Sequence, residues 1–367
     1  MDSMTLTLPF DRSHIQPGDR ICAAISGGAD SVALLLTLHA ANTAKHDALG
    51  VGISAVHVDH GIRSREESAA DQHFVEALCA SLEVPLHFHS ASVPDRAAKT
   101  GETIEEAARA VRYDFFRTLV ATGQADSILT AHTLDDQAET VLMKLLRGAW
   151  TEGLSAIHPV VIVNTPNQHP GKILRPFLHT RRAEIESFLH ALNQPWREDA
   201  TNADPAYTRN RIRHQLLPQL RNQLREYNPN LDQTLANLAE LAREEESRWQ
   251  AELSRLLPQL LLPGKPVRGG GRAVSTAPGE SSVAIELDRL RPLDPALRRR
   301  VLRAAARQLG ARLSFDETAR LLAFCGFAPY PPVGSPTVAA RTGSTLHLAN
   351  NLRAERSPRE LRLFRQP

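Results

Sequence analysis

The first residues along this sequence that could carry out chemistry form a short run of small and polar residues, Ser26-Gly27-Gly28-Ala29-Asp30-Ser31. An apolar run, residues 20–25, precedes it, and an apolar stretch typical of a buried helix, residues 32–41, follows it. A strand, a tight turn and a helix in this order aim several backbone N–H groups at one point, at the positive end of the helix. The run therefore predicts an anion site, with phosphate as the expected ligand.

The carboxylate of this turn indicates how a phosphate would be handled. The turn lacks the lysine with which phosphate loops cradle a triphosphate during transfer of its terminal phosphoryl group. It contains Asp30 instead, and a carboxylate there could hold Mg²⁺ against bound phosphates. A tight turn whose glycines serve only the backbone is the alternative interpretation.

A second cluster, residues 131–140, combines one histidine with three carboxylates. A helix that begins at Asp135 places Asp136 and Glu139 on one face, with His132 in the turn before it. Such a group can bind a cation, hold an ammonium group or accept a proton. Alternatively, the first carboxylate only caps the helix and Glu139 forms a structural ion pair.

The elements that must position these clusters alternate between strands and helices. The patterns predict strands at 20–25, 50–59, 85–90 and 124–130 and helices at 32–41, 64–82, 103–120 and 135–147. This alternation is typical of an α/β fold, a parallel, doubly wound sheet with helices on both sides. Ligands bind beyond the carboxyl ends of such strands, so the glycine turn, residues 57–63 and the acidic cluster should converge on one edge.

Charge is unevenly distributed along the 367 residues. Residues 1–200 contain 17 Lys and Arg and 25 Asp and Glu, whereas residues 201–367 contain 26 and 16. The C-terminal part is therefore the better candidate for a polyanionic partner, and its arginines suit bidentate phosphate contacts. A solvated arginine-rich surface explains the same composition.

A series of motifs stands here in the order seen in tRNA(Ile)-lysidine synthetases, a family of PP-loop ATP pyrophosphatases, and the sequence resembles that family. The motifs cover roughly residues 20–220 and read SGGADS, HVDHGIR, EEAARAVRYDFF, AHTLDDQAET, LLRG, RPFL, and EDATN followed by TRNRIRHQLLP. The resemblance implies a two-step reaction that uses ATP and Mg²⁺. ATP adenylates C2 of the wobble cytidine of the isoleucine tRNA with a CAU anticodon, and the ε-amine of free L-lysine then displaces AMP.

The resemblance also assigns roles to individual residues. The implied catalytic residues are Asp30, which also serves as the metal ligand, His132, Asp136, Glu139 and Arg112. The nucleotide is expected on Ser26, Gly27, Gly28, Ala29, Asp30, Ser31, His57 and Arg63. The implied tRNA contacts are Arg209, Asn210 and Arg213, for which ion pairs to the acidic first part of the chain are the alternative.

We expect four segments along the chain. They are a PP-loop ATP-binding catalytic domain (1–215), a helical connector (216–263), a flexible linker or loop (264–283) and a basic, mainly helical C-terminal tRNA-binding domain (284–367). Because no apolar run approaches the ~18 residues of a membrane span, we expect a soluble, cytoplasmic protein with no membrane contact. A homodimer is one option for its oligomeric state.

Two other classes of function compete with this interpretation. Another PP-loop ATP pyrophosphatase, a tRNA thiolase or an ammonia-dependent synthetase, would share the glycine turn. Thiolase chemistry commonly needs cysteine pairs, however, and the three cysteines, Cys22, Cys79 and Cys325, are far apart. A nucleotide-binding module without catalysis would keep the turn but would not need Asp136 and Glu139.

Overall fold

A computed structural model describes residues 7–165, 170–198, 204, 206–263, 265–266, 272–273, 282–327 and 343–365. Its contacts divide the chain into two compact units, Met1–Glu246 and Ser247–Pro367. None of the helices in the described ranges is both long and apolar enough to cross a bilayer. The boundaries of the four expected segments remain predictions.

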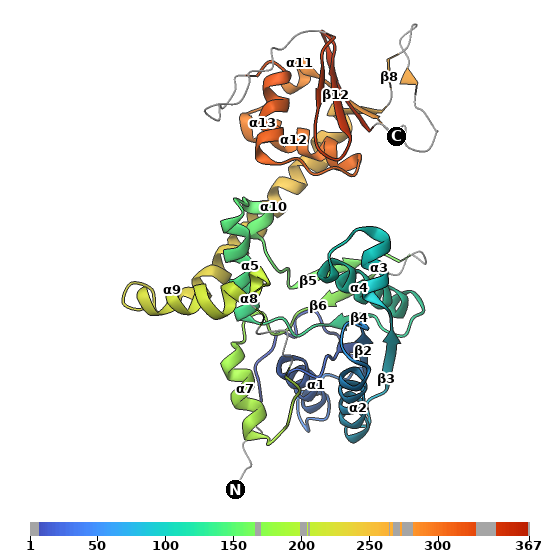
Figure 1. Ribbon diagram of the computed structural model, residues 1–367, viewed down its shortest axis with the longest axis vertical. Helices are drawn as coiled ribbons and strands as arrows, with labels where there is room; N and C mark the ends of the chain where they lie inside the picture. Colours follow the sequence, from blue (N-terminus) through green and yellow to red (C-terminus); the bar gives the residue numbers. More distant parts are fainter. Residues whose placement is uncertain are drawn as a thin grey trace. The chain divides into compact units, whose positions relative to one another are not determined.

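The first unit is built on a six-stranded sheet in the order β3-β2-β1-β4-β6-β5 (Figure 1). Neighbouring strands are parallel except β5, which runs antiparallel to β6. The strands are β1 (Arg20–Ala24), β2 (Gly52–Asp59), β3 (Leu86–Ser90), β4 (Ser127–Leu129), β5 (Val160–Val163) and β6 (Gly171–Leu174). This topology confirms the predicted α/β class with its doubly wound parallel sheet.

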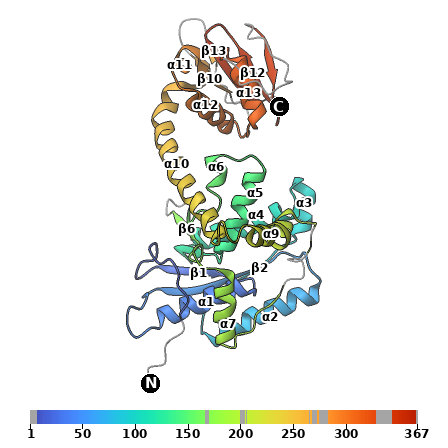
Figure 2. The ribbon, with the colours of Figure 1, turned by 90° about the vertical axis from the view of Figure 1, so that its left-hand side faces the viewer.

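Helices cover both faces of this sheet. The helices of this unit are α1 (Ala29–Asn42), α2 (Arg65–Ser81), α3 (Val93–Thr100), α4 (Ile104–Ala121), α5 (Leu134–Leu146), α6 (Thr151–Leu154), α7 (Arg182–Ala191), α8 (Thr208–Arg211), the π-helical turn η2 (Ile212–Leu216) and α9 (Leu217–Gln223), of which the last three form a group packed on α5. Capping boxes with a Ser or Thr at the N-cap start three of them, with Ser64 before α2, Thr103 before α4 and Thr133 before α5. Figure 2 shows α1, α2 and α7 together on one side of β1 and β2.

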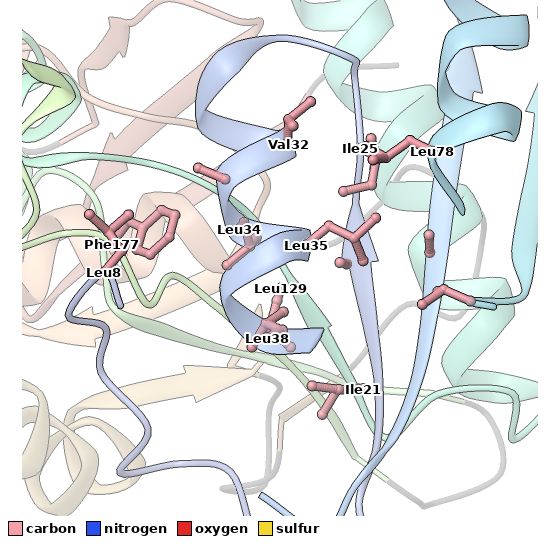
Figure 3. Packing of buried hydrophobic residues seen from close by; sticks show 14 of the residues in the cluster. Leu8, Ile21, Ile25, Val32, Leu34, Leu35, Leu38, Leu78, Leu129 and Phe177 are labelled. Atoms are coloured by element: carbon pink, nitrogen blue, oxygen red, sulfur yellow. The ribbon is translucent and has the colours of Figure 1, made fainter. Parts of the chain in front are cut away.

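The alternation of side chains along β1 explains how both faces become covered. Ile21 packs in one core cluster with Leu35 and Leu38 of α1 (Figure 3). The neighbouring residue, Cys22, lies in a different cluster on the other face, with Phe116 of α4. The carboxyl ends of the central strands are thereby held between two packed layers, and the loops that follow them form the edge at which ligands bind.

The second unit begins within the long helix α10 (Leu231–Leu260) and contains a five-stranded antiparallel sheet in the order β11-β12-β13-β10-β7. The strands are β7 (Leu261–Pro263), β10 (Ser282–Glu286), β11 (Thr345–His347), β12 (Leu352–Arg356) and β13 (Glu360–Arg365), and β8 (Lys265–Pro266) pairs separately with β9 (Arg272–Ala273). The helices are α11 (Leu287–Leu290), α12 (Pro295–Gln308) and α13 (Phe315–Phe324). The C-terminal part, which was expected to be mainly helical, thus also contains a five-stranded sheet. The expected linker, 264–283, lies largely outside the described residues.

Candidate active site

The glycine turn has the geometry that an anion site requires. Gly27 adopts a φ of +90°, in the left-handed region that favours glycine. A Cβ there would lie 3.4 Å from Cγ of Arg197, whose backbone N–H donates to the Gly27 carbonyl over 2.9 Å. Ser31 closes the turn because its hydroxyl donates to the carbonyl of Gly28, the N-cap of α1, over 2.9 Å. The first N–H groups of α1 have no acceptor within the helix and can bind an anion.

Asp30 lies in the first turn of α1 and is suited to a metal ion that arrives with phosphate. Its Oδ1 is buried and has no hydrogen-bond partner in the described structure, and its Oδ2 lies 3.9 Å from Nη1 of Arg182. Burial raises the pKa of Asp30 to about 7, against the opposing effect of Arg182. The described ranges hold no cluster of three metal-ligating side chains. A buried carboxylate oxygen without a partner in the described structure suits Mg²⁺, which commonly takes its further ligands from phosphates and water.

His57 and Arg63 are linked to the glycine turn through neighbouring residues. Nδ1 of the buried His57 lies 2.7 Å from the carbonyl oxygen of Ile25, the residue that leads into the turn. Arg63 pairs with Asp71 of α2, and Asp71 also accepts a 2.9 Å hydrogen bond from Nε of Arg197. Sequence analysis missed Asp71 and Arg197, because no local pattern marks an ion pair between residues so far apart in the chain.

The acidic cluster meets the predicted tRNA-contacting arginines. Asp136 Oδ2 accepts hydrogen bonds from the backbone N–H and hydroxyl of Thr133, the N-cap of α5, over 3.0 and 3.2 Å. Asp136 Oδ1 accepts from Nη2 of both Arg209 and Arg213 over 2.8 Å each. Burial would raise the pKa of Asp136, but Arg209, His132 and Arg213 outweigh it and lower this pKa. Asp136 is therefore ionised and fully partnered.

Glu139 completes the four-charge cluster. Its side chain is 2% exposed, and it accepts from Nε of Arg209 over 2.9 Å and from Nε of Arg213 over 2.5 Å. The two arginines come from α8 and η2, which pack on α5. The ion pairs that were the alternative for Arg209 and Arg213 are therefore present. Asn210, between them, donates from Nδ2 to the Asp204 carbonyl over 2.9 Å.

Loss of one arginine from this cluster should destabilise the folded protein. The substitution Arg213→Gln is expected to lower the free energy of unfolding by about 3 to 5 kcal/mol, because Asp136 and the buried Glu139 would then share Arg209 as their cationic partner. Urea denaturation measures the change. Arg211→Gln, on the exposed side of the same segment, is the matched control. A loss below about 1 kcal/mol for Arg213→Gln would contradict a tightly coupled cluster.

His132 and Arg112 lie close enough to influence each other electrostatically. Nδ1 of His132 lies 3.0 Å from the hydroxyl of Thr130. Burial lowers the pKa of His132 to about 4, with Arg175, Arg209 and Arg112 acting in the same direction against Asp136, so the imidazole is neutral at pH 7. Arg112 is partly buried and forms no hydrogen bond or ion pair with any described residue.

A cavity of about 340 Å³ adjoins Glu139. Its wall contains both carboxylates and cationic side chains and is formed by Asp135, Glu139, Arg182, Glu186, Arg213, His214, Leu217 and Arg221. Asp135 does not cap its own helix. Its Oδ2 instead accepts from the backbone N–H of Arg182, at the start of α7, over 2.9 Å. A mixed-charge wall of this kind suits a zwitterionic ligand.

Comparison with known proteins agrees with this arrangement. The PP-loop domain model matches residues 5–220, more than half of the chain, so the sheet and its glycine turn define a PP-loop protein. The chain is 35% identical over 298 residues to the tRNA(Ile)-lysidine synthase of Nitratidesulfovibrio vulgaris, which covers 80% of each protein. The chain therefore belongs to the tRNA(Ile)-lysidine synthase family, and the predicted resemblance is confirmed.

Other relatives show how much of a family member the chain represents. It is 39% identical over 288 residues to the tRNA(Ile)-lysidine synthase of Solibacter usitatus, which covers 78% of this chain and 56% of that protein. It is 37% identical over 312 residues to that of Geobacter sulfurreducens, with 84% and 60% covered. The chain thus spans little more than half the length of these two relatives. A second model, the TilS substrate binding domain, matches residues 286–330.

Proposed function

We propose that this chain is an ATP-dependent ligase that joins free L-lysine to C2 of the wobble cytidine in a CAU-anticodon isoleucine tRNA. The observation that carries the proposal is the pairing of Asp136 and Glu139 with Arg209 and Arg213, next to the glycine turn in a chain of this family. A module that only binds nucleotides has no need for such a buried charge cluster. The proposal includes a cytoplasmic location.

The first step forms a bond between the C2 oxygen of cytidine and the α-phosphorus of ATP, and breaks the bond to pyrophosphate. The N–H groups of the turn Ser26–Ser31 would bind the phosphates and stabilise the charge that develops as pyrophosphate leaves. Asp30 would hold Mg²⁺, which would supply further neutralisation of that charge. Arg112, which has no carboxylate partner in the described residues, would add a positive charge near the phosphates.

The second step forms a bond between the ε-nitrogen of lysine and C2, and breaks the C2–O bond so that AMP leaves. We assign lysine to the mixed-charge cavity beside Glu139. There, burial would lower the pKa of the lysine amine, which favours its nucleophilic neutral form. Neutral His132, two residues before the start of α5, is a candidate for taking up the proton.

RNA contacts by Arg209, Asn210 and Arg213 remain part of the proposal. Because both arginines already bind carboxylates, an RNA phosphate would have to share their guanidinium groups. In the second unit, the guanidinium of Arg299 lies 4.9 Å from the ring centre of the exposed Phe315, a pair that suits contact with phosphate and base. Light scattering of the purified protein would decide whether a homodimer forms.

Transfer of labelled lysine to RNA tests the proposal. Purified protein, ATP and an unmodified transcript of the CAU-anticodon isoleucine tRNA should release pyrophosphate and incorporate the label, whereas methionine tRNA should not. Pyrophosphate release without lysine incorporation would indicate another nucleophile. ATP binding with no turnover would support the nucleotide-binding module instead.

A further inference from the structure

The hydroxyl of Tyr113 on α4 is surrounded by cations. Its oxygen accepts hydrogen bonds from Nη2 of Arg109 over 3.1 Å and from Nη2 of Arg175 over 3.0 Å. The guanidinium of Arg109 also lies 4.6 Å from the centre of the tyrosine ring. Both lone pairs of the phenol oxygen are therefore occupied, and its proton remains available for donation to an acceptor.

Arg175 is an unusual residue in this environment. It is 5% exposed, donates from Nη1 to the carbonyl of His158 and from Nη2 to Tyr113, and leaves Nε buried without a partner in the described structure. A buried guanidinium is normally paired with a carboxylate because an uncompensated charge is costly to bury. No carboxylate accounts for Arg175 within the described ranges.

The same lack of compensation extends to neighbouring residues on α4. Arg109, Arg112 and Tyr113 share one face of the helix, and neither arginine forms an ion pair with a described carboxylate. The Asp136 cluster is the opposite case, since its two arginines meet two carboxylates. A group of donors and cations without an internal anion is a site built for an external one.

The position of this group is the edge where ligands bind. Arg175 directly follows β6, and β6 is joined to the end of β4 by the hydrogen bond from the Thr130 N–H to the Leu174 carbonyl over 2.9 Å. His132 comes two residues after Thr130, and Arg112 and Arg175 both contribute positive charge at His132. The donors therefore lie at the same edge of the sheet as the glycine turn.

We propose that the hydroxyl of Tyr113, with Arg109 at the rim, binds a phosphate group of the nucleotide substrates beside Arg112, and that Arg175 positions Tyr113 for this contact. The inference rests on the proposed function, because it names the part of the substrate that these residues take. The phosphate comes either from the adenylyl group or from the backbone of single-stranded RNA. Both sources present the same oxyanion to the same donors.

Binding measurements with AMP and with a five-nucleotide single-stranded RNA test the site. Tyr113→Phe keeps the ring and removes only the hydroxyl, and it is expected to raise the Kd of at least one probe by about ten- to a hundredfold, as loss of a hydrogen bond to a charged group does. Arg117→Met is the matched control, since Arg117 is an exposed residue of α4 that pairs with Asp114. This control should leave both Kd values unchanged.

Variants of Arg175 separate positioning from folding. Arg175→Met should weaken binding of the same probe as Tyr113→Phe, and Arg175→Lys, which keeps one charged donor, should recover part of the affinity. Because Arg175→Met also removes the bond to the His158 carbonyl, its thermal unfolding is measured alongside. Equal affinity for Lys and Met variants of equal stability would overturn the positioning role.

The two probes identify the source of the phosphate. Weaker binding of AMP alone assigns the adenylyl group, and weaker binding of RNA alone assigns the RNA backbone. Unchanged Kd values for both probes in Tyr113→Phe would overturn the phosphate site, even if the parent protein incorporates lysine. Conversely, weakened binding in a protein that never incorporates lysine would support the site and refute the proposed function.

Discussion

Replacement of Asp136 by asparagine is expected to reduce lysine transfer by at least about a hundredfold while ATP still binds. Asp136 Oδ1 accepts from Arg209 and Arg213 at once, and a neutral amide oxygen is a much weaker acceptor for two guanidinium groups. The substitution also changes the net charge of the four-residue cluster from zero to +1, which repels a lysine ammonium group. Incorporation of labelled lysine in a single turnover measures the effect.

A matched control separates this effect from a general loss of charge. Asp95→Asn, at an exposed position in the first turn of α3, should transfer lysine at the parental rate. Because Asp136 also caps α5 through Thr133, the melting temperature of Asp136→Asn is compared with that of the parent. Parental lysine transfer by a stable Asp136→Asn variant would refute the assignment of lysine to this cluster.

The glycine turn and the acidic cluster were predictable because their signals are local. Residues 26–31 stand between an apolar strand and an apolar helix, so a contiguous stretch specifies both the turn and its surroundings. The partner of Glu139 was not predictable in this way. Arg213 lies 74 residues away, and an arginine near the end of a domain suits an RNA phosphate as well as a buried carboxylate. Only tertiary packing distinguishes the two.

Short strands account for most of what sequence analysis missed in the fold. β5 has four residues, too few for alternation to stand out from chance, and it pairs antiparallel in an otherwise parallel sheet. β12 and β13 alternate buried Leu or Ala with polar residues, as in Leu361 and Leu363. Because arginine and glutamate occupy several of the other positions, the composition of this tail resembled that of a solvated surface more than that of a sheet.

The substitution Asp30→Asn is expected to stabilise the folded protein and to slow pyrophosphate release strongly. Burial raises the pKa of Asp30 from its ordinary value near 3.8 to about 7, so the folded state binds this proton more tightly than the unfolded state. The contribution of Asp30 to stability therefore falls as pH rises from about 4 to about 7 and is least favourable above pH 7. Removal of the charge should then increase the free energy of unfolding by about 2 to 4 kcal/mol at pH 8.

Thermal unfolding without nucleotide, at pH 8 and pH 4.5, measures this gain, which should shrink at the lower pH because the folded parent already carries the proton there. The same variant should release pyrophosphate from ATP at least about a hundredfold more slowly, since its neutral amide oxygen is a much weaker ligand for Mg²⁺ than a carboxylate. Asp95→Asn again serves as the control. A lower melting temperature for Asp30→Asn at both pH values would mean that Asp30 Oδ1 has a stabilising partner. Higher stability with lost activity would instead show that Asp30 destabilises the folded protein and is required for binding its ligand.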